Sequence, residues 1–239
     1  MMNSKLLRLC LWSILFVVVI GCKRANDEST VQPNAIQFED GDILFQDLDC
    51  GPFCDAIEKV TVGYKGANLS HVGMVVNTES GNTQVIEANG NGVIFTHLDT
   101  FLQRQLDDKG NPKVIHARLN SDYGKLIPTA IKESKALLGK PYDEVFDINN
   151  DSYYCSELIY WAFKNANGGT PLFELKPMTF IDPDTDKTFT IWEDYYEDLG
   201  VSIPEGLPGL NPGGMSTAAS IDILRVLGGV SGKSGVVKN

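Results

Sequence analysis

Hydrophobic residues recur along the chain with two different periods, and the change of period predicts the elements of the fold. Short apolar runs bounded by turn residues such as Gly, Asn and Asp are typical of β-strands. Five strands are expected, at residues 41–46, 71–77, 84–89, 93–98 and 113–119. The turns that separate the second, third and fourth runs are short, so these strands are expected to form an antiparallel meander.

Three other segments carry helical periodicity, at residues 49–61, 127–138 and 155–166. The last of them is the strongest, because its apolar residues recur three and four positions apart until Gly168 and Gly169 end the pattern. Strands and helices are segregated along the chain rather than alternating. The sequence therefore predicts an α+β fold, with helices packed against an antiparallel sheet of about five strands.

The amino terminus has the pattern of an export signal. Lys5 and Arg8 precede an apolar run at 11–20, which is shorter than the roughly 20 residues of a membrane-spanning helix. The run ends in Val-Ile-Gly-Cys, which resembles a bacterial lipobox with Cys22 as the lipidated residue; an uncleaved amino-terminal anchor is the alternative. We expect a signal peptide at 1–21, a lipidated tether at 22–37 and attachment to the bacterial cell envelope, on its periplasmic or surface face.

Charge restricts the partners of the mature protein. Removal of residues 1–21 takes away two of the 20 basic residues and none of the 31 acidic ones, so the net charge falls from −11 to −13. Such an acidic chain is not expected to bind nucleic acid. Anionic lipid headgroups would repel it, so membrane attachment is expected to depend on the lipid at Cys22.

The cysteines that remain in the mature chain divide by spacing. Cys50 and Cys54 can form a small disulfide in an oxidising compartment, or remain two thiols on one helix face. No histidine lies near them in sequence, which disfavours a metal site, and no cofactor is expected. Cys155 is left over and is a candidate reactive thiol.

Cys155 opens the strongest helical pattern, and this position favours nucleophilic chemistry. The unpaired N–H groups and partial positive charge of a helix amino terminus stabilise a thiolate, and they can bind the oxyanion of an attacked carbonyl. The base is expected to be His71, which opens an apolar strand; His97 and His116 lie inside strand patterns. A structural role for either Cys155 or His71 alone is the competing interpretation.

A third group should orient the imidazole of His71. Glu87 lies in the next strand of the meander, between apolar neighbours, where a cross-strand contact with His71 is available. Asn89, two residues further on the same face, is the alternative orienting residue. A Glu87 that simply faces solvent is the third possibility.

Five short motifs resemble the YiiX/YebB-like branch of the NlpC/P60 superfamily, whose members are circularly permuted papain-like thiol hydrolases. They occur in the expected order, at 41–45, 70–75, 86–93, 139–143 and 154–158. The resemblance covers about residues 38–170, which would be the catalytic domain, with 171–239 as a carboxyl-terminal extension packed on it or capping it. It implies Cys155 as nucleophile, His71 as base and Glu87 as orienting group.

The same resemblance suggests further site residues and a reaction. Tyr142, thirteen residues before Cys155, is expected to bind the oxyanion or substrate; Tyr154 and Asp42 lie in the same motifs and are further candidates. The expected reaction is cleavage of an amide bond, in a peptide or isopeptide of the cell wall, through a thioester. A lipid-directed acyl hydrolase or acyltransferase ranks second, and a non-catalytic envelope binding module third.

Overall fold

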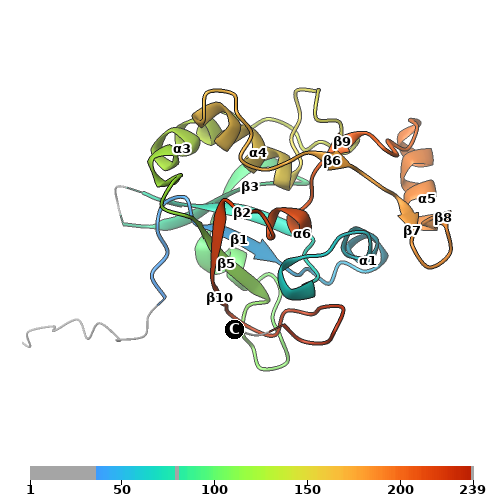
Figure 1. The fold of residues 1–239 in the computed structure, drawn as a ribbon, viewed down its shortest axis with the longest axis horizontal. Coiled ribbons are helices and arrows are strands. Elements are labelled where there is room, and N and C mark those ends of the chain that lie inside the picture. Colours follow the sequence, from blue (N-terminus) through green and yellow to red (C-terminus); the bar gives the residue numbers. More distant parts are fainter. Residues whose placement is uncertain (1–35, 79–80, 238–239) are drawn as a thin grey trace, which may run out of the picture. The chain divides into compact units, whose positions relative to one another are not determined.

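A six-stranded antiparallel sheet lies at the centre of the unit formed by residues 37–239 (Figure 1). The structure is a computed structural model that describes residues 36–78 and 81–237; the expected signal peptide and Cys22 lie outside them. The strand order is β10–β5–β1–β2–β3–β4. The strands are β1 (Ile43–Gln46), β2 (His71–Asn77), β3 (Thr83–Asn89), β4 (Gly92–His97), β5 (Val114–Leu119) and β10 (Ile221–Val226). The five predicted strands and the α+β class are confirmed, and β10 is an addition.

The alternation of side chains gives the sheet two buried faces. Met74 and Ile86 pair across β2 and β3 and join the main core under the helices α3 (Ile127–Ala136) and α4 (Cys155–Ala166). Val75 and Val85 form the next pair and face the other way, against the short helix α2 (Leu98–Leu102). Glu87 follows Val85 by two residues, so it points to the α2 side of the sheet.

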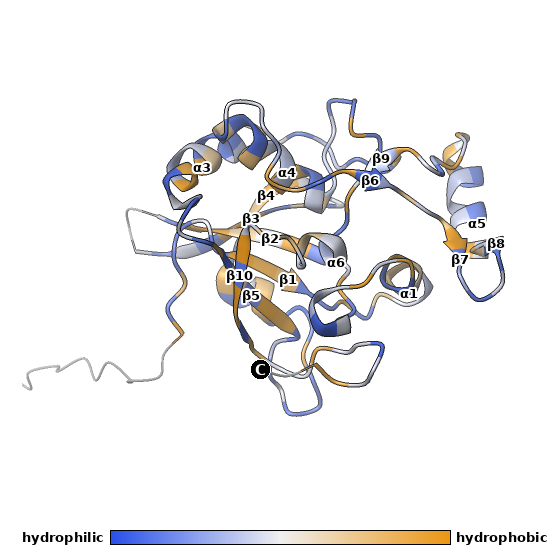
Figure 2. Ribbon diagram, viewed as in Figure 1, coloured by the Kyte–Doolittle hydropathy of each residue, from blue (hydrophilic) through white to orange (hydrophobic). Residues whose placement is uncertain are grey.

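Helix α4 anchors the main core. Its face toward the sheet carries Leu158, Ile159 and Phe163, all completely buried, and α3 packs beside it (Figure 1). Each such side chain contributes about 1.5–3 kcal/mol on burial. Figure 2 shows the same contrast, with apolar strands at the centre and polar stretches on the helices around them. This packing fixes the amino terminus of α4 above the sheet.

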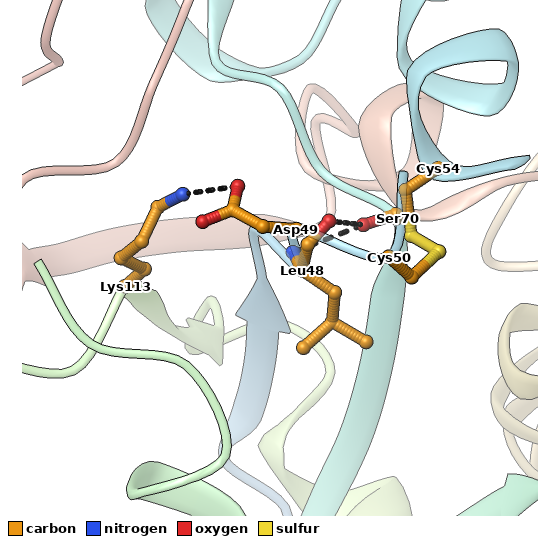
Figure 3. Close-up of a disulfide and its surroundings, with 6 residues drawn as sticks. All are labelled: Leu48, Asp49, Cys50, Cys54, Ser70 and Lys113. Carbon is orange, nitrogen blue, oxygen red and sulfur yellow. Dashed lines mark hydrogen bonds and ion pairs between the residues drawn. A yellow bond between two sulfur atoms is a disulfide. The ribbon is translucent and has the colours of Figure 1, made fainter. Parts of the chain in front are cut away.

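A disulfide closes the start of helix α1 (Pro52–Lys59). Cys50 and Cys54 are bonded, which settles the alternative that the sequence left open (Figure 3). Pro52 begins the helix, so it is shorter than the predicted 49–61 segment. The preceding loop is held to the strand that carries His71, because the Leu48 N–H donates to Ser70 Oγ at 3.1 Å.

The segment after residue 170 is part of the fold, although its sequence pattern is weak. It contains α5 (Thr190–Leu199), α6 (Pro212–Met215) and the short strands β6 (Lys176–Pro177), β7 (Ile181–Asp182), β8 (Lys187–Thr188) and β9 (Pro208–Gly209). Helix α5 packs on α1 through a cluster that includes Phe180, Trp192 and Tyr196. The final stretch of the described chain buries Val230 and Val237.

Two short 3₁₀ helices, Tyr64–Gly66 and Gly124–Leu126, complete the regular elements. Among the described residues, no helix has the length and apolar character needed to cross a membrane.

Candidate active site

Cys155 is the first residue of α4, and the residue is 7% exposed. The chain enters the helix through Tyr154 in an extended conformation, and the Tyr154 N–H donates to Glu157 Oε2 at 3.3 Å. The amide groups of the first turn have no carbonyl partner within the helix, so they surround the thiol with partial positive charge. Cys155 is the free cysteine of the described chain, since Cys50 and Cys54 are bonded to each other.

His71 lies between the thiol and a carboxylate. It is the first residue of β2, and its Nε2 is 2.5 Å from Glu87 Oε2. The ring also makes a hydrogen bond with Cys155. Because Nε2 is engaged by Glu87, Nδ1 is the nitrogen left to face the thiol. The structure therefore brings together the three residues that the sequence singled out.

The electrostatic surroundings favour a protonated His71. Burial alone would lower its pKa, but the hydrogen bonds with Cys155 and Glu87 and the negative charge of both partners outweigh burial and raise the pKa to about 9. At neutral pH the ring is then an imidazolium that contacts the Glu87 carboxylate and the Cys155 sulfur. This arrangement can keep a thiolate ready and hold a proton for a leaving group.

Glu87 is completely buried and fully bonded, so it is not a solvent-facing residue. Besides His71, it accepts hydrogen bonds from Thr96 Oγ1 at 2.5 Å and from Asn89 Nδ2 at 3.2 Å. Asn89, the alternative orienting residue, thus contacts Glu87 and helps to hold it. Burial would raise the pKa of Glu87, but the hydrogen bonds from Arg104 and His71 hold it well below its usual range.

Arg104 is a residue of this site that the sequence did not reveal. Its guanidinium donates to both carboxylate oxygens of Glu87, at 2.6 and 2.9 Å. It follows α2 in a turn with no apolar period or motif around it. The contact arises only because α2 packs across the face of the sheet to which Glu87 points.

A cavity of about 400 Å³ opens beside Cys155. Its walls come from α1, from the loop before α4 and from the segment after residue 170, and they are mainly apolar. Among the lining residues are Ile57, Val60, Tyr142, Phe146, Tyr154, Leu172, Phe173, Met178, Phe180, Trp192, Leu210 and Met215. Residues far apart in sequence thus form one apolar chamber at the thiol.

Tyr142 and Tyr154, both predicted near the nucleophile, line this cavity. Burial raises the pKa of each phenol well above its ordinary value, so both hydroxyls stay protonated and can donate hydrogen bonds. The Tyr154 hydroxyl also accepts from the Leu210 N–H at 3.3 Å, and Ser156 Oγ donates to the Leu210 carbonyl at 2.9 Å. These two bonds fasten the segment after residue 170 to the start of α4.

Asp42, expected as a substrate or oxyanion candidate, lies away from the cavity. It is buried against His116, whose Nε2 is 2.6 Å from Asp42 Oδ2, and Arg118, whose Nε donates to Asp42 Oδ1 at 2.6 Å. Gln46, at the other end of β1, is the residue that pairs with His71. Four steps of about 3.3 Å each along the chain separate Asp42 from that position. The sequence motif at residues 41–45 does not indicate which end of β1 lies near Cys155.

A helix that begins with a cysteine and packs on an antiparallel sheet that supplies a histidine is typical of papain-like hydrolases, here with the histidine before the cysteine in the chain. The model of a family described as permuted papain-like amidase enzymes, YaeF/YiiX, C92 family, matches residues 37–223. The chain belongs to this family. The match continues past residue 170, into the segment that the sequence motifs did not cover.

Two relatives support this assignment. The uncharacterized protein YiiX of Escherichia coli (strain K12) is 33% identical over 135 residues, which is 56% of this chain and 61% of that protein. The crystal structure of metalloprotein YiiX from Escherichia coli O157:H7 matches with a TM-score of 0.67 and 25% identity, over 81% of this chain and 99% of the other. The permuted papain-like fold predicted from the motifs is thereby confirmed.

The description of that crystal structure as a metalloprotein does not extend to a recognisable site here. Within residues 36–78 and 81–237, no group of three or more His, Cys, Asp or Glu side chains is arranged to hold a metal ion. His71 Nε2 is hydrogen-bonded to Glu87, and the other ring nitrogen of His71 faces Cys155. The described residues therefore do not fit a metal ion at this site.

Proposed function

We propose that the protein is a cysteine amidase in which Cys155 is the nucleophile and His71 the general base and acid. Glu87 orients the His71 ring and stabilises its protonated form. The single observation that carries the proposal is the position of the His71 ring, hydrogen-bonded to Glu87 on one side and to Cys155 on the other. An inert buried thiol has no need of a histidine held in this way.

The reaction would proceed in two steps. The Cys155 thiolate attacks the amide carbonyl, the C–N bond breaks, and the amine leaves with the proton from His71. Water then gives a proton to His71 and attacks the thioester, which releases the acid and restores the thiolate. The N–H groups at the start of α4 and the hydroxyl of Tyr142 are the expected donors to the oxyanion.

The cavity supports an apolar acyl group as the part of the substrate that is bound. Its walls carry aromatic and aliphatic side chains, such as Phe146, Phe173 and Trp192, which gain free energy by excluding water from an alkyl chain. Cell-wall peptides, the substrates expected from the compartment, offer shorter and more polar side chains. We therefore place lipid-like amides or esters before wall peptides.

The location remains part of the proposal. An amino-terminal lipid at Cys22 would hold the domain at the envelope membrane, where long acyl groups are concentrated. Mass analysis of protein from the membrane fraction of a bacterial host tests this: a diacylglyceryl adduct on Cys22 supports it. An unmodified, uncleaved amino terminus would contradict it.

The catalytic proposal is tested with a series of p-nitroanilides that carry two, eight or fourteen acyl carbons. The full-length protein in detergent should release nitroaniline, with kcat/KM rising with chain length, and Cys155→Ala should abolish the release. Ser70→Ala, which leaves the proposed triad intact, serves as the control for changes near the cavity. Equal rates for wild type and Cys155→Ala would reject catalysis and favour a binding module.

A further inference from the structure

We infer that Arg104 is a positioning residue of the proposed site, which sets the charge balance of the His71–Glu87 pair. The inference rests on the proposed function for its catalytic consequence, but its physical basis is the side-chain network itself. Arg104 does not line the cavity and would not touch substrate. It would act through Glu87.

The contact between Arg104 and Glu87 uses two bonds in a fixed geometry. Nη2 donates to Oε1 at 2.6 Å and Nη1 donates to Oε2 at 2.9 Å. Oε2 is also the oxygen that contacts His71. A two-bonded guanidinium fixes the plane of a carboxylate more strictly than an ammonium ion does, so Arg104 determines where Oε2 meets the imidazole.

Arg104 is itself held in place by the sheet. Its Nη1 also donates to Gln46 Oε1 at 3.1 Å, and Gln46 Nε2 donates to the Phe101 carbonyl at 2.8 Å. The guanidinium carbon lies 5.1 Å from the centre of the Phe101 ring. Gln46 pairs directly with His71 in the strand register. Gln46, the strand partner of His71, is therefore hydrogen-bonded to Arg104, the cation that contacts Glu87.

Charge gives this network its function. His71 contacts the Glu87 carboxylate and the Cys155 sulfur. Without a second cation, the full negative charge of Glu87 would act on the imidazolium. Arg104 shares that charge, so His71 keeps a pKa from which it can still release its proton to a leaving amine. The side chain of Arg104 is 29% exposed, so its effect on His71 is reduced by solvent.

The chain contains a matched control. Arg118 contacts buried Asp42 through two bonds, Nε to Oδ1 at 2.6 Å and Nη2 to Oδ2 at 2.9 Å, and Asp42 in turn contacts His116. This is the same Arg–carboxylate–His arrangement, but it lies away from the cavity. Loss of Arg118 should perturb folding in a comparable way without acting on His71.

The test is a titration of the imidazole signals by NMR in full-length protein with ¹³C,¹⁵N-labelled histidine, where the sequence holds three histidines. Arg104→Gln should raise the pKa of His71 by about one unit, as expected for loss of a unit charge one carboxylate away at a partly exposed position. Arg104→Lys should return it most of the way to the wild-type value, and Arg118→Gln should leave it unchanged.

If the protein hydrolyses the acyl p-nitroanilides, the alkaline limb of its pH–rate profile should move to higher pH in Arg104→Gln. The size of this move should match the change in the His71 pKa measured by NMR. A His71 pKa that stays the same or falls in Arg104→Gln, in a variant that keeps the wild-type circular dichroism, would overturn the inference. The NMR result does not depend on hydrolysis. A shift without any hydrolysis would therefore sustain the role of Arg104 at His71 and count against the proposed function alone.

Discussion

Replacing Glu87 by glutamine removes one charge from the site and nearly preserves the shape of the side chain. In the wild type, burial works against the imidazolium of His71, and the partners Cys155 and Glu87 together raise its pKa to about 9. In Glu87→Gln only the contacts with Cys155 still oppose burial, so the pKa of His71 should fall from about 9 toward the ordinary value of about 6.5. The difference corresponds to about 3 kcal/mol in the preference for the protonated ring.

The consequence is largest at mildly alkaline pH. At pH 8, a ring with a pKa of about 9 is about 90% protonated, whereas one with a pKa of about 6.5 is about 3% protonated. The kcat/KM for an acyl p-nitroanilide at pH 8 should therefore fall about 30-fold in Glu87→Gln, with the alkaline limb moving toward neutral pH. The assay is the pH profile between pH 5 and 10.

Thr96→Val is the control, because it removes one hydrogen bond to Glu87 and keeps the carboxylate charge. Its alkaline limb should stay closer to that of the wild type. The reasoning is wrong if Glu87→Gln, shown to be folded by circular dichroism, keeps an alkaline limb near pH 9. In that case Glu87 would not be the group that raises the pKa of His71.

Three further predictions concern stability, measured as melting temperature. Burial raises the pKa of Glu157 to about 8; because this exceeds the unfolded value of 4.5, the wild type loses stability as pH rises from about 4.5 to about 8. Glu157→Gln should therefore melt higher than wild type at pH 8 and equally at pH 4.5; equal melting at pH 8 would contradict this. Cys54→Ser removes the disulfide with Cys50 and should lower the free energy of unfolding by about 2 kcal/mol without abolishing hydrolysis. An unchanged melting temperature would show that the disulfide does not stabilise the fold. Gly92→Ala places a Cβ against the Lys140 carbonyl oxygen at a positive φ and should lower the melting temperature strongly; a wild-type melting temperature would refute the close contact.

The sequence predicted the elements of the proposed site because each has a local signal. Cys155 opens a helical period, His71 opens an apolar strand, and Glu87 lies on the adjacent strand of a meander. Strand adjacency turns such signals into a spatial prediction, and the structure brings the three side chains together. Short turns bring Glu87 close to His71, whereas the position of Cys155 beside them was implied by the family resemblance.

Other features depend on packing between distant segments, which no local pattern encodes. Arg104 reaches Glu87 only through the placement of α2 on the sheet. Strand β10 (Ile221–Val226) lies among Gly-, Pro- and Ser-rich stretches that obscure its alternation, and its pairing with β5 comes from about a hundred residues away. The spacing of Cys50 and Cys54 fits both a disulfide and two thiols, so only the fold decides between them.

The measurement that tests the central proposal most directly is the mass of the intact protein after a brief reaction with p-nitrophenyl octanoate at pH 7. The account predicts a single octanoyl adduct that maps to Cys155, is removed by neutral hydroxylamine as a thioester is, and is lost in His71→Ala. An adduct on another residue, or undiminished acylation of Cys155 in His71→Ala, would contradict the proposal that these two residues form the catalytic pair.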